Sequence, residues 1–89
     1  MELQVFNNAE FGSVRTAMVN GDVMFVGKDV TGILGYSNPR DAINKHVDAE
    51  DKGVAKCDTL GGTQDLTVIN ESGLYSLILT SKMPKAKAF

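Results

Sequence analysis

The residues most able to do chemistry in this sequence lie in a short polar stretch near its middle. Arg40, Asn44 and Lys45 fall within a segment that is typical of a short helix. Arg40 and Asn44 are four residues apart, so they share one helical face. Arginine can bind guanine edges and asparagine can bind adenine edges, while lysine commonly contacts phosphate. The same pattern also fits the solvated face of any small domain, and the residues alone favour neither interpretation.

Five further basic residues extend this candidate DNA-binding set. Arg15 and Lys28 precede the polar stretch, and Lys82, Lys85 and Lys87 lie near the C-terminus with no acidic residue among them. A short run of like charges is usually only a solvated segment. The formal net charge is −2, so non-specific affinity for phosphate should be weak. Any binding to DNA must therefore depend on a local basic face.

Nothing in the sequence predicts catalysis. His46 is the only histidine and Cys57 the only cysteine. A Cys–His pair can act as nucleophile and base, but no third group accompanies this one. Cys57 lies in an alternating strand pattern, where a free cysteine is usually a small buried hydrophobe. We expect no enzyme activity, no metal and no cofactor, and we expect His46 to interact with the end of its helix or with Asp48 or Glu50.

Two β-hairpins and an N-terminal strand are predicted. Asn20-Gly21 separates two β-rich runs and is typical of a type I′ turn, because both residues accept positive φ. Gly61-Gly62 separates a second pair of runs. The expected strands cover residues 3–6, 13–19, 22–26, 54–60 and 63–69. Residues 48–52 are polar and predict a loop.

Three short helices complete the expected fold. The first covers residues 28–34 and ends at Gly35, and the second covers residues 39–46 with Asn38 as its cap and Pro39 at its first position. The third begins at Glu71 or Ser72, and its many apolar residues predict a central place in the core. Pro84 is suited to open one more helical turn. This order predicts a small single α+β domain and not a doubly wound parallel sheet.

Composition excludes several classes of protein. The 89 residues are 43% hydrophobic, which suits one globular domain. No apolar run approaches the roughly 20 residues that a membrane-spanning helix needs. The first residues lack the pattern of a secretory signal, and a single cysteine cannot form an internal disulfide. We therefore expect a cytoplasmic protein with no membrane partner and no small-molecule substrate.

The sequence resembles the Bro-N domain, the N-terminal domain of the BRO family, which is found in prophage antirepressors and in large DNA viruses of insects. Two blocks carry most of the resemblance: Leu34-Gly35-Tyr36-Ser37-Asn38-Pro39-Arg40-Asp41-Ala42-Ile43 and Ile69-Asn70-Glu71-Ser72-Gly73-Leu74-Tyr75-Ser76-Leu77-Ile78. Shorter matches occur at residues 5–6, 11–12, 14–15, 25–30, 46–48, 51–52, 81–82 and 86–89.

The resemblance implies a phage or prophage antirepressor-type module that binds DNA and acts in transcriptional control of the lysogenic switch, in a bacterial host. The alternative is a protein interaction module that binds a phage repressor without contacting DNA. Exposed apolar residues such as Tyr36, an uncovered surface over Leu77–Leu79, or a symmetric homodimer would favour the alternative. Family members continue beyond Phe89 with another helix, so we expect residues 1–89 to be a Bro-N domain that stops before its final helix.

Overall fold

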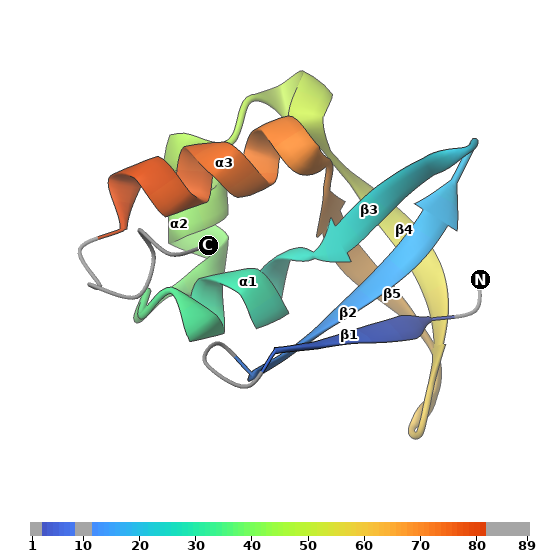
Figure 1. Ribbon diagram of the computed structural model, residues 1–89. Helices are drawn as coiled ribbons and strands as arrows, with labels where there is room; N and C mark the ends of the chain where they lie inside the picture. The colour runs from blue at the N-terminus through green and yellow to red at the C-terminus, as the bar shows by residue number, and fades with distance from the viewer. Residues whose placement is uncertain (1–2, 9–11, 82–89) are drawn as a thin grey trace.

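The computed structural model describes residues 3–8 and 12–81, and these form a five-stranded antiparallel sheet with three α-helices (Figure 1). The α+β class predicted from the sequence is therefore confirmed. In chain order the elements are β1 (Gln4–Asn8), β2 (Gly12–Val19), β3 (Asp22–Val26), α1 (Gly27–Ile33), α2 (Pro39–His46), a 3₁₀ turn (Ala49–Asp51), β4 (Lys52–Thr59), β5 (Gly62–Ile69) and α3 (Glu71–Thr80).

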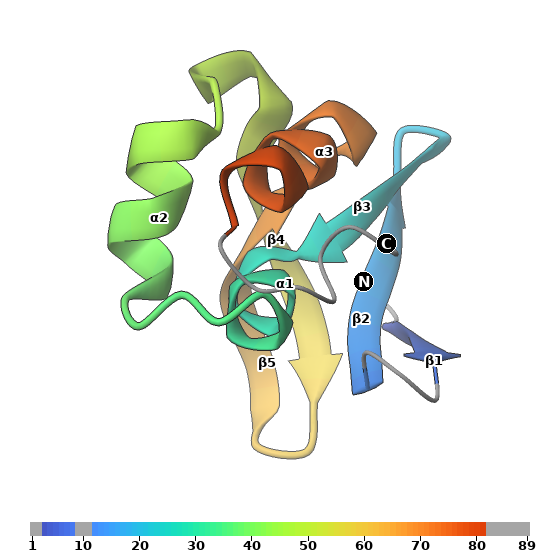
Figure 2. The ribbon, with the colours of Figure 1, turned by 60° about the vertical axis from the view of Figure 1, so that its left-hand side comes forward.

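The sheet consists of a three-stranded meander, β1-β2-β3, and the β4–β5 hairpin, and the two are joined only briefly. Its strand order is β1-β2-β3-β5-β4, and β3 meets β5 through two residue pairs, Phe25 with Ile69 and Val26 with Val68. Because this junction is short, the hairpins diverge, and their turns point in different directions in Figure 1. The three helices gather at the opposite side of the molecule, as Figure 2 also shows.

The buried side chains form two separate clusters, one on each face of the sheet. The larger cluster joins the helices to the sheet and contains Val14, Val30, Leu34, Ala42, Ile43, Val47, Ile69, Leu74 and Leu77. The smaller one lies on the other face and contains Val26, Ala55, Cys57, Leu66 and Val68. Cys57 is completely buried there, as expected for a structural cysteine.

The two hairpin turns differ from each other. Asn20 and Gly21 have φ angles of 52° and 85°, which confirms the predicted type I′ turn. In the second hairpin the turn residues are Leu60 and Gly61, one position earlier than predicted. The positive φ, 100°, falls on Gly62, which pairs with Thr59 at the end of the ladder. The Thr59 hydroxyl donates a hydrogen bond to the Gly62 carbonyl at 2.7 Å, which helps to fix this register.

The helix boundaries follow the predicted capping residues. The Asn38 side chain accepts a 3.1 Å hydrogen bond from the Asp41 amide, and α2 covers the residues expected of it. Gly35 has a φ of 83°, in keeping with its predicted role at the end of α1. Asn70 caps α3 in the same way as Asn38 caps α2, through a 2.9 Å bond from the Gly73 amide. α1 begins at Gly27, one residue earlier than predicted.

One expectation about the surface was wrong, and the expected central place of α3 in the core is confirmed for one side of the helix. Residues 49–51 form a 3₁₀ turn that leads directly into β4, where a loop through residue 52 was expected. α3 is central only along one stripe, since Leu74 and Leu77 are buried while Tyr75 and Leu79 are exposed. Pro84 and its predicted helical turn lie outside the described residues.

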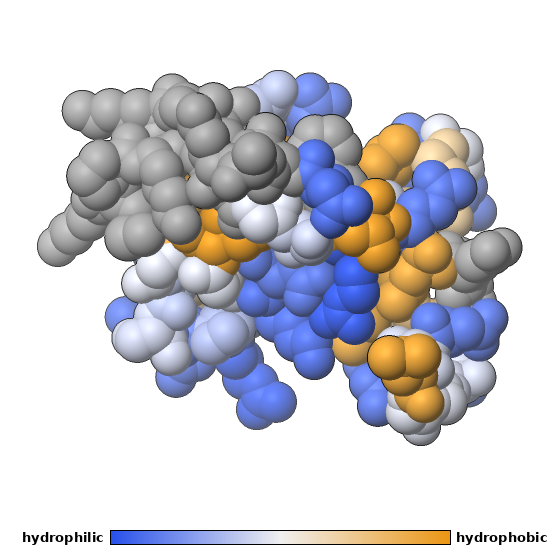
Figure 3. Space-filling model, turned by 60° about the horizontal axis from the view of Figure 1, so that its bottom comes forward, coloured by the Kyte–Doolittle hydropathy of each residue, from blue (hydrophilic) through white to orange (hydrophobic). Residues whose placement is uncertain are grey.

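Exposed apolar side chains are scattered over several elements. They are Val5, Met18, Val23, Val54, Leu60, Tyr75 and Leu79. On the face drawn in Figure 3, hydrophobic atoms lie beside a hydrophilic area and do not cover the face as one patch. Within the described residues, no helix has the length and apolar character needed to cross a membrane.

Candidate nucleic-acid interface

A groove runs between α2 and the neighbouring face of the β4–β5 hairpin. It has a volume of about 540 Å³. Its apolar lining includes Val26, Ile43 and Val54, of which only Val54 is exposed, and its polar lining includes three cations. The described residues that line it are Val26, Lys28, Pro39, Arg40, Ile43, Asn44, Ala49, Lys52, Gly53, Val54, Asp65 and Thr67.

Helix α2 forms one wall of this groove. Ala42 and Ile43 are buried against the rest of the protein, so the polar side of the helix is left at the surface. Arg40 and Asn44 are exposed, lie one turn apart and both line the groove, as their spacing predicted. The cap at Asn38 fixes where the helix begins, and it therefore fixes where these two side chains project.

The opposite wall contributes a lysine that sequence reasoning missed. Lys52, the first residue of β4, donates a hydrogen bond from Nζ to Asn44 Oδ1 at 3.1 Å. The two residues are eight positions apart, and the 3₁₀ turn between them brings β4 back beside α2. The only sequence feature that could have indicated this contact is the position of Lys52 directly after the acidic segment, residues 48–51.

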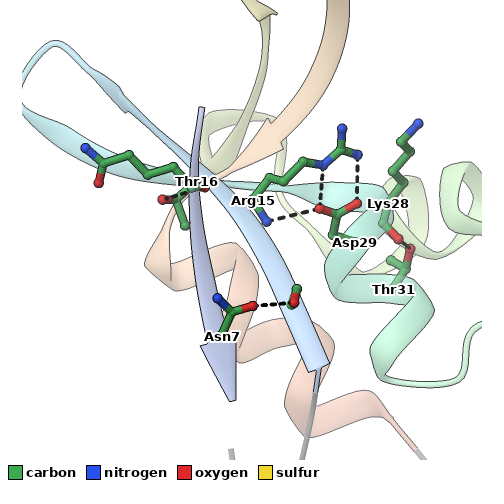
Figure 4. Close-up of polar contacts among 8 residues, drawn as sticks. Asn7, Arg15, Thr16, Lys28, Asp29 and Thr31 are labelled. Carbon is green, nitrogen blue, oxygen red and sulfur yellow. Dashed lines mark hydrogen bonds and ion pairs between the residues drawn. The ribbon is translucent and has the colours of Figure 1, made fainter. Parts of the chain in front are cut away.

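Lys28 reaches the groove from a third element, the first turn of α1. Its neighbour Asp29 is occupied by Arg15: the Arg15 Nε and Nη2 atoms donate to the two carboxylate oxygens, each at 2.8 Å, and the Arg15 amide donates at 3.0 Å (Figure 4). No described residue forms an ion pair with Lys28, and Figure 4 draws its amino group apart from the Arg15–Asp29 pair. Within the described part of the chain, Lys28 therefore acts on the Asp29 carboxylate only through its charge and not through a direct ion pair.

The Arg15–Asp29 pair is partly buried, and the interaction shifts the pKa of both groups. Burial by itself would raise the pKa of Asp29, but the hydrogen bonds from Arg15, together with the charges of Arg15 and Lys28, outweigh it and lower that pKa. The hydrogen bond to Asp29 raises the pKa of Arg15. Because the pair joins β2 to α1, Arg15 contributes to the fold, and its charge is largely offset where it stands.

The other predicted basic residues lie elsewhere. Lys45 is exposed and forms a 3.2 Å ion pair with Asp41 along α2, and it does not line the groove. Lys82, Lys85 and Lys87 lie outside the described residues. The structure therefore brings Lys28, Arg40 and Asn44 together and adds Lys52. Among the described residues that line the groove there are three cations and one carboxylate, that of Asp65.

Tyr36 holds the connection between α1 and α2 against α3. Its hydroxyl donates to the Leu77 carbonyl at 2.8 Å, and its ring lies 5.9 Å from that of His46. Tyr36 is half-buried and Leu77 fully buried, whereas Leu79 is exposed, so the exposed apolar surface considered above is present at Leu79 but not at Tyr36 or Leu77. His46 ends α2 and packs beside this ring, and no described carboxylate forms an ion pair with it, so the expected contact with Asp48 or Glu50 is not seen.

His46 and Cys57 do not form a pair. Cys57 belongs to the smaller buried cluster, whereas His46 packs beside Tyr36 among the helices. Among residues 3–8 and 12–81, no three His, Cys, Asp or Glu side chains lie together in a way that could hold a metal ion.

Comparison with known proteins points to one family. The family model for the BRO family, N-terminal domain (Bro-N), matches residues 13–89. Protein 289L of Invertebrate iridescent virus 6, which is named for a Bro-N domain, is 41% identical over 83 aligned residues, covering 73% of this chain and 20% of that protein. An uncharacterized protein of Haemophilus influenzae is 42% identical over 71 residues, covering 78% of this chain and 34% of that protein.

A second protein of the same virus, 201R, also named for a Bro-N domain, is 31% identical over 102 residues and covers 92% of this chain. The chain spans between about a fifth and a third of the length of these relatives. No solved structure matches it significantly.

Proposed function

This chain belongs to the Bro-N family, and from that premise we propose that it is a DNA-binding regulatory module of the antirepressor type, acting in transcriptional control of a lysogenic switch. One observation supports this proposal most directly. Lys28, Arg40 and Lys52, from α1, α2 and β4, converge on a single groove although the chain as a whole is acidic. Three cations on one concave surface suit a chain of phosphates.

The groove is better suited to phosphate contacts than to the reading of bases. An asparagine that reads adenine uses its carbonyl oxygen as acceptor and its amide group as donor. Asn44 Oδ1 already accepts a hydrogen bond from Lys52, so this reading would have to compete with that bond. Arg40 and the two lysines are left to hold the sugar–phosphate backbone, which gives affinity with little dependence on sequence.

The proposal is tested by fluorescence anisotropy with a random-sequence duplex at low salt. The wild-type chain should bind, and the double variant Arg40→Ala/Lys52→Ala should bind roughly tenfold or more weakly, because two phosphate contacts are lost. Lys45→Ala is the control, since it removes an exposed positive charge from the same helix as Arg40 but outside the groove. No binding by the wild-type chain at tens of micromolar would contradict the proposal.

The alternative, a module that binds a phage repressor, is supported by a different surface. Tyr75 and Leu79 are 52% and 84% exposed and lie four residues apart on α3, so they form one apolar strip. Exposed tyrosine side chains are common anchors in protein interfaces, and the exposed Leu79 extends the apolar area beside Tyr75. A pull-down with the repressor encoded beside the gene discriminates the two functions. Capture that is lost in Leu79→Asp, combined with no binding to DNA, would favour the alternative.

A further inference from the structure

Strand β4 is an open edge of the sheet. It pairs with β5 on one side, and no described strand lies on its other side. It is eight residues long and contains no proline. An edge of this length presents unpaired backbone N–H and C=O groups, on which another strand can be added. Natural proteins often protect such edges with lysine, and β4 carries Lys56 near its centre.

The side chains of β4 alternate between two very different faces. Ala55 and Cys57 point into the smaller buried cluster. Val54, Lys56 and Asp58 point to the other face, where all three are exposed. Leu60 follows in the turn and is fully exposed, while Val54 is 70% exposed. No described residue forms an ion pair with Lys56 or Asp58. Lys56 lies opposite Asp65 of β5 in the ladder, and Asp58 Oδ1 accepts a 3.2 Å hydrogen bond from the Thr63 hydroxyl.

This pattern is complementary to itself in one antiparallel register. When a second copy of β4 is placed beside the first with a twofold axis at Cys57, Lys56 lies opposite Asp58 of the second copy. The same axis brings Val54 near Leu60 of the second copy, the turn residue just beyond the end of β4. In a twofold interface each contact occurs twice, so the edge gains two pairs of opposite charges and two apolar pairs.

The neighbouring registers are disfavoured by charge. An axis at position 56 places Lys56 opposite Lys56 of the second copy. An axis at position 58 places Asp58 opposite Asp58 of the second copy. Like charges directly opposite each other destabilise a strand pair. A lysine on an edge strand usually disfavours pairing with any further strand. Here Lys56 disfavours the registers that place it opposite another lysine, but it favours the register that places it opposite Asp58 of the second copy.

We propose that two copies of this chain associate through their β4 edges, antiparallel and centred on Cys57, so that their sheets join. The inference rests on β4 alone and not on the proposed function. It has one consequence for the groove, because Lys52 and Val54 line it. A dimer of this kind carries two copies of the groove, related by twofold symmetry.

The experiment is sedimentation equilibrium over a concentration series from micromolar to millimolar. The wild-type chain should show a reversible monomer–dimer equilibrium. Lys56→Glu and Asp58→Lys should each be monomeric alone, because each places like charges opposite each other. An equimolar mixture of the two variants should dimerise again, since the two introduced charges then face each other and the two native charges do the same.

Two controls separate loss of the interface from loss of the fold. Lys45→Glu changes an exposed charge on α2 and should dimerise as the wild type does. Leu60→Lys lies at a fully exposed turn, so it should fold normally and weaken the dimer. Circular dichroism and thermal melting check each variant. A wild-type monomer at every concentration, single charge variants that dimerise normally, or a mixture that stays monomeric would each overturn the proposal.

Discussion

Basic residues in two neighbouring regions of this molecule are used in opposite ways. At the junction of β2 and α1, Arg15 donates two hydrogen bonds to the two carboxylate oxygens of Asp29, and both side chains are partly buried. In the groove, neither Lys28 nor Arg40 has an ion-pair partner among the described residues. The first region uses its positive charge for the fold, and the second leaves it available to a partner.

The comparison shows why counting basic residues is a poor guide to a binding surface. Arg15, Arg40 and Lys45 are equivalent in a list of charges. In the structure one is tied to a strand–helix junction, one lines a groove and one forms an exposed pair along its own helix. Only the position of each nearby carboxylate distinguishes them.

The largest effect is expected at the junction. Asp29→Ala leaves Arg15 partly buried without its partner, so the free energy of unfolding should fall by about 2–3 kcal/mol. The matched control, Asp41→Ala, removes one member of the exposed pair with Lys45 and should cost less than about 0.5 kcal/mol. Urea denaturation of both variants measures the difference. Equal losses of unfolding free energy would show that the partly buried Arg15–Asp29 pair stabilises the fold no more than the exposed Lys45–Asp41 pair.

The dependence of stability on pH should separate the same two regions. The pKa of Asp29 is lower in the folded protein, so its ionised form stabilises the fold. This contribution is fully present above the unfolded-state value, about 3.9, and is lost as the pH falls through the folded value below it. Asp29→Asn should therefore flatten the decline in unfolding free energy below about pH 4. A profile as steep as that of the wild type would contradict this assignment.

A smaller effect is expected where α1 meets α2. A Cβ atom at Gly27 would lie 2.6 Å from Cδ1 of Ile43, so Gly27→Ala should cost about 1–2 kcal/mol through overpacking. Ile43→Val removes that methyl group, and the double variant should lose less than the sum of the two single losses. Additive losses in thermal denaturation would show that the contact does not limit how closely α1 packs.

The smallest effect is expected for Lys45→Ala. Its charge is already matched by Asp41 at the surface, and it does not line the groove. Both the melting temperature and the affinity for duplex DNA should change little. A loss of affinity as large as that from Arg40→Ala would place the binding surface on the outer side of α2 instead of in the groove.

Local signals in the sequence predicted most of the fold, because its turns and caps depend on single residues. Asn20-Gly21 supplies positive φ for a type I′ turn, and Asn38-Pro39 fixes the start of α2. The second turn lies one residue earlier than predicted, because either Gly61 or Gly62 could adopt a positive φ. The strand alternation alone does not choose between them.

The candidate site was less predictable, because its contacts connect distant parts of the chain. The spacing of Arg40 and Asn44 placed both on one face of α2. Their neighbour Lys52 depends on how β4 returns beside that helix, which no local pattern encodes. The same holds for Arg15, whose partner Asp29 is 14 residues away across a hairpin.

The salt dependence of DNA binding tests the central claim most directly. For each phosphate contact, the logarithm of the association constant changes by about 0.9 per logarithmic unit of salt. The triple variant Lys28→Ala/Arg40→Ala/Lys52→Ala should therefore bind with a slope shallower by roughly 2–3 than that of the wild type, while Lys45→Ala keeps the wild-type slope. A triple variant with the wild-type slope would contradict the assignment of the groove as the phosphate-binding surface.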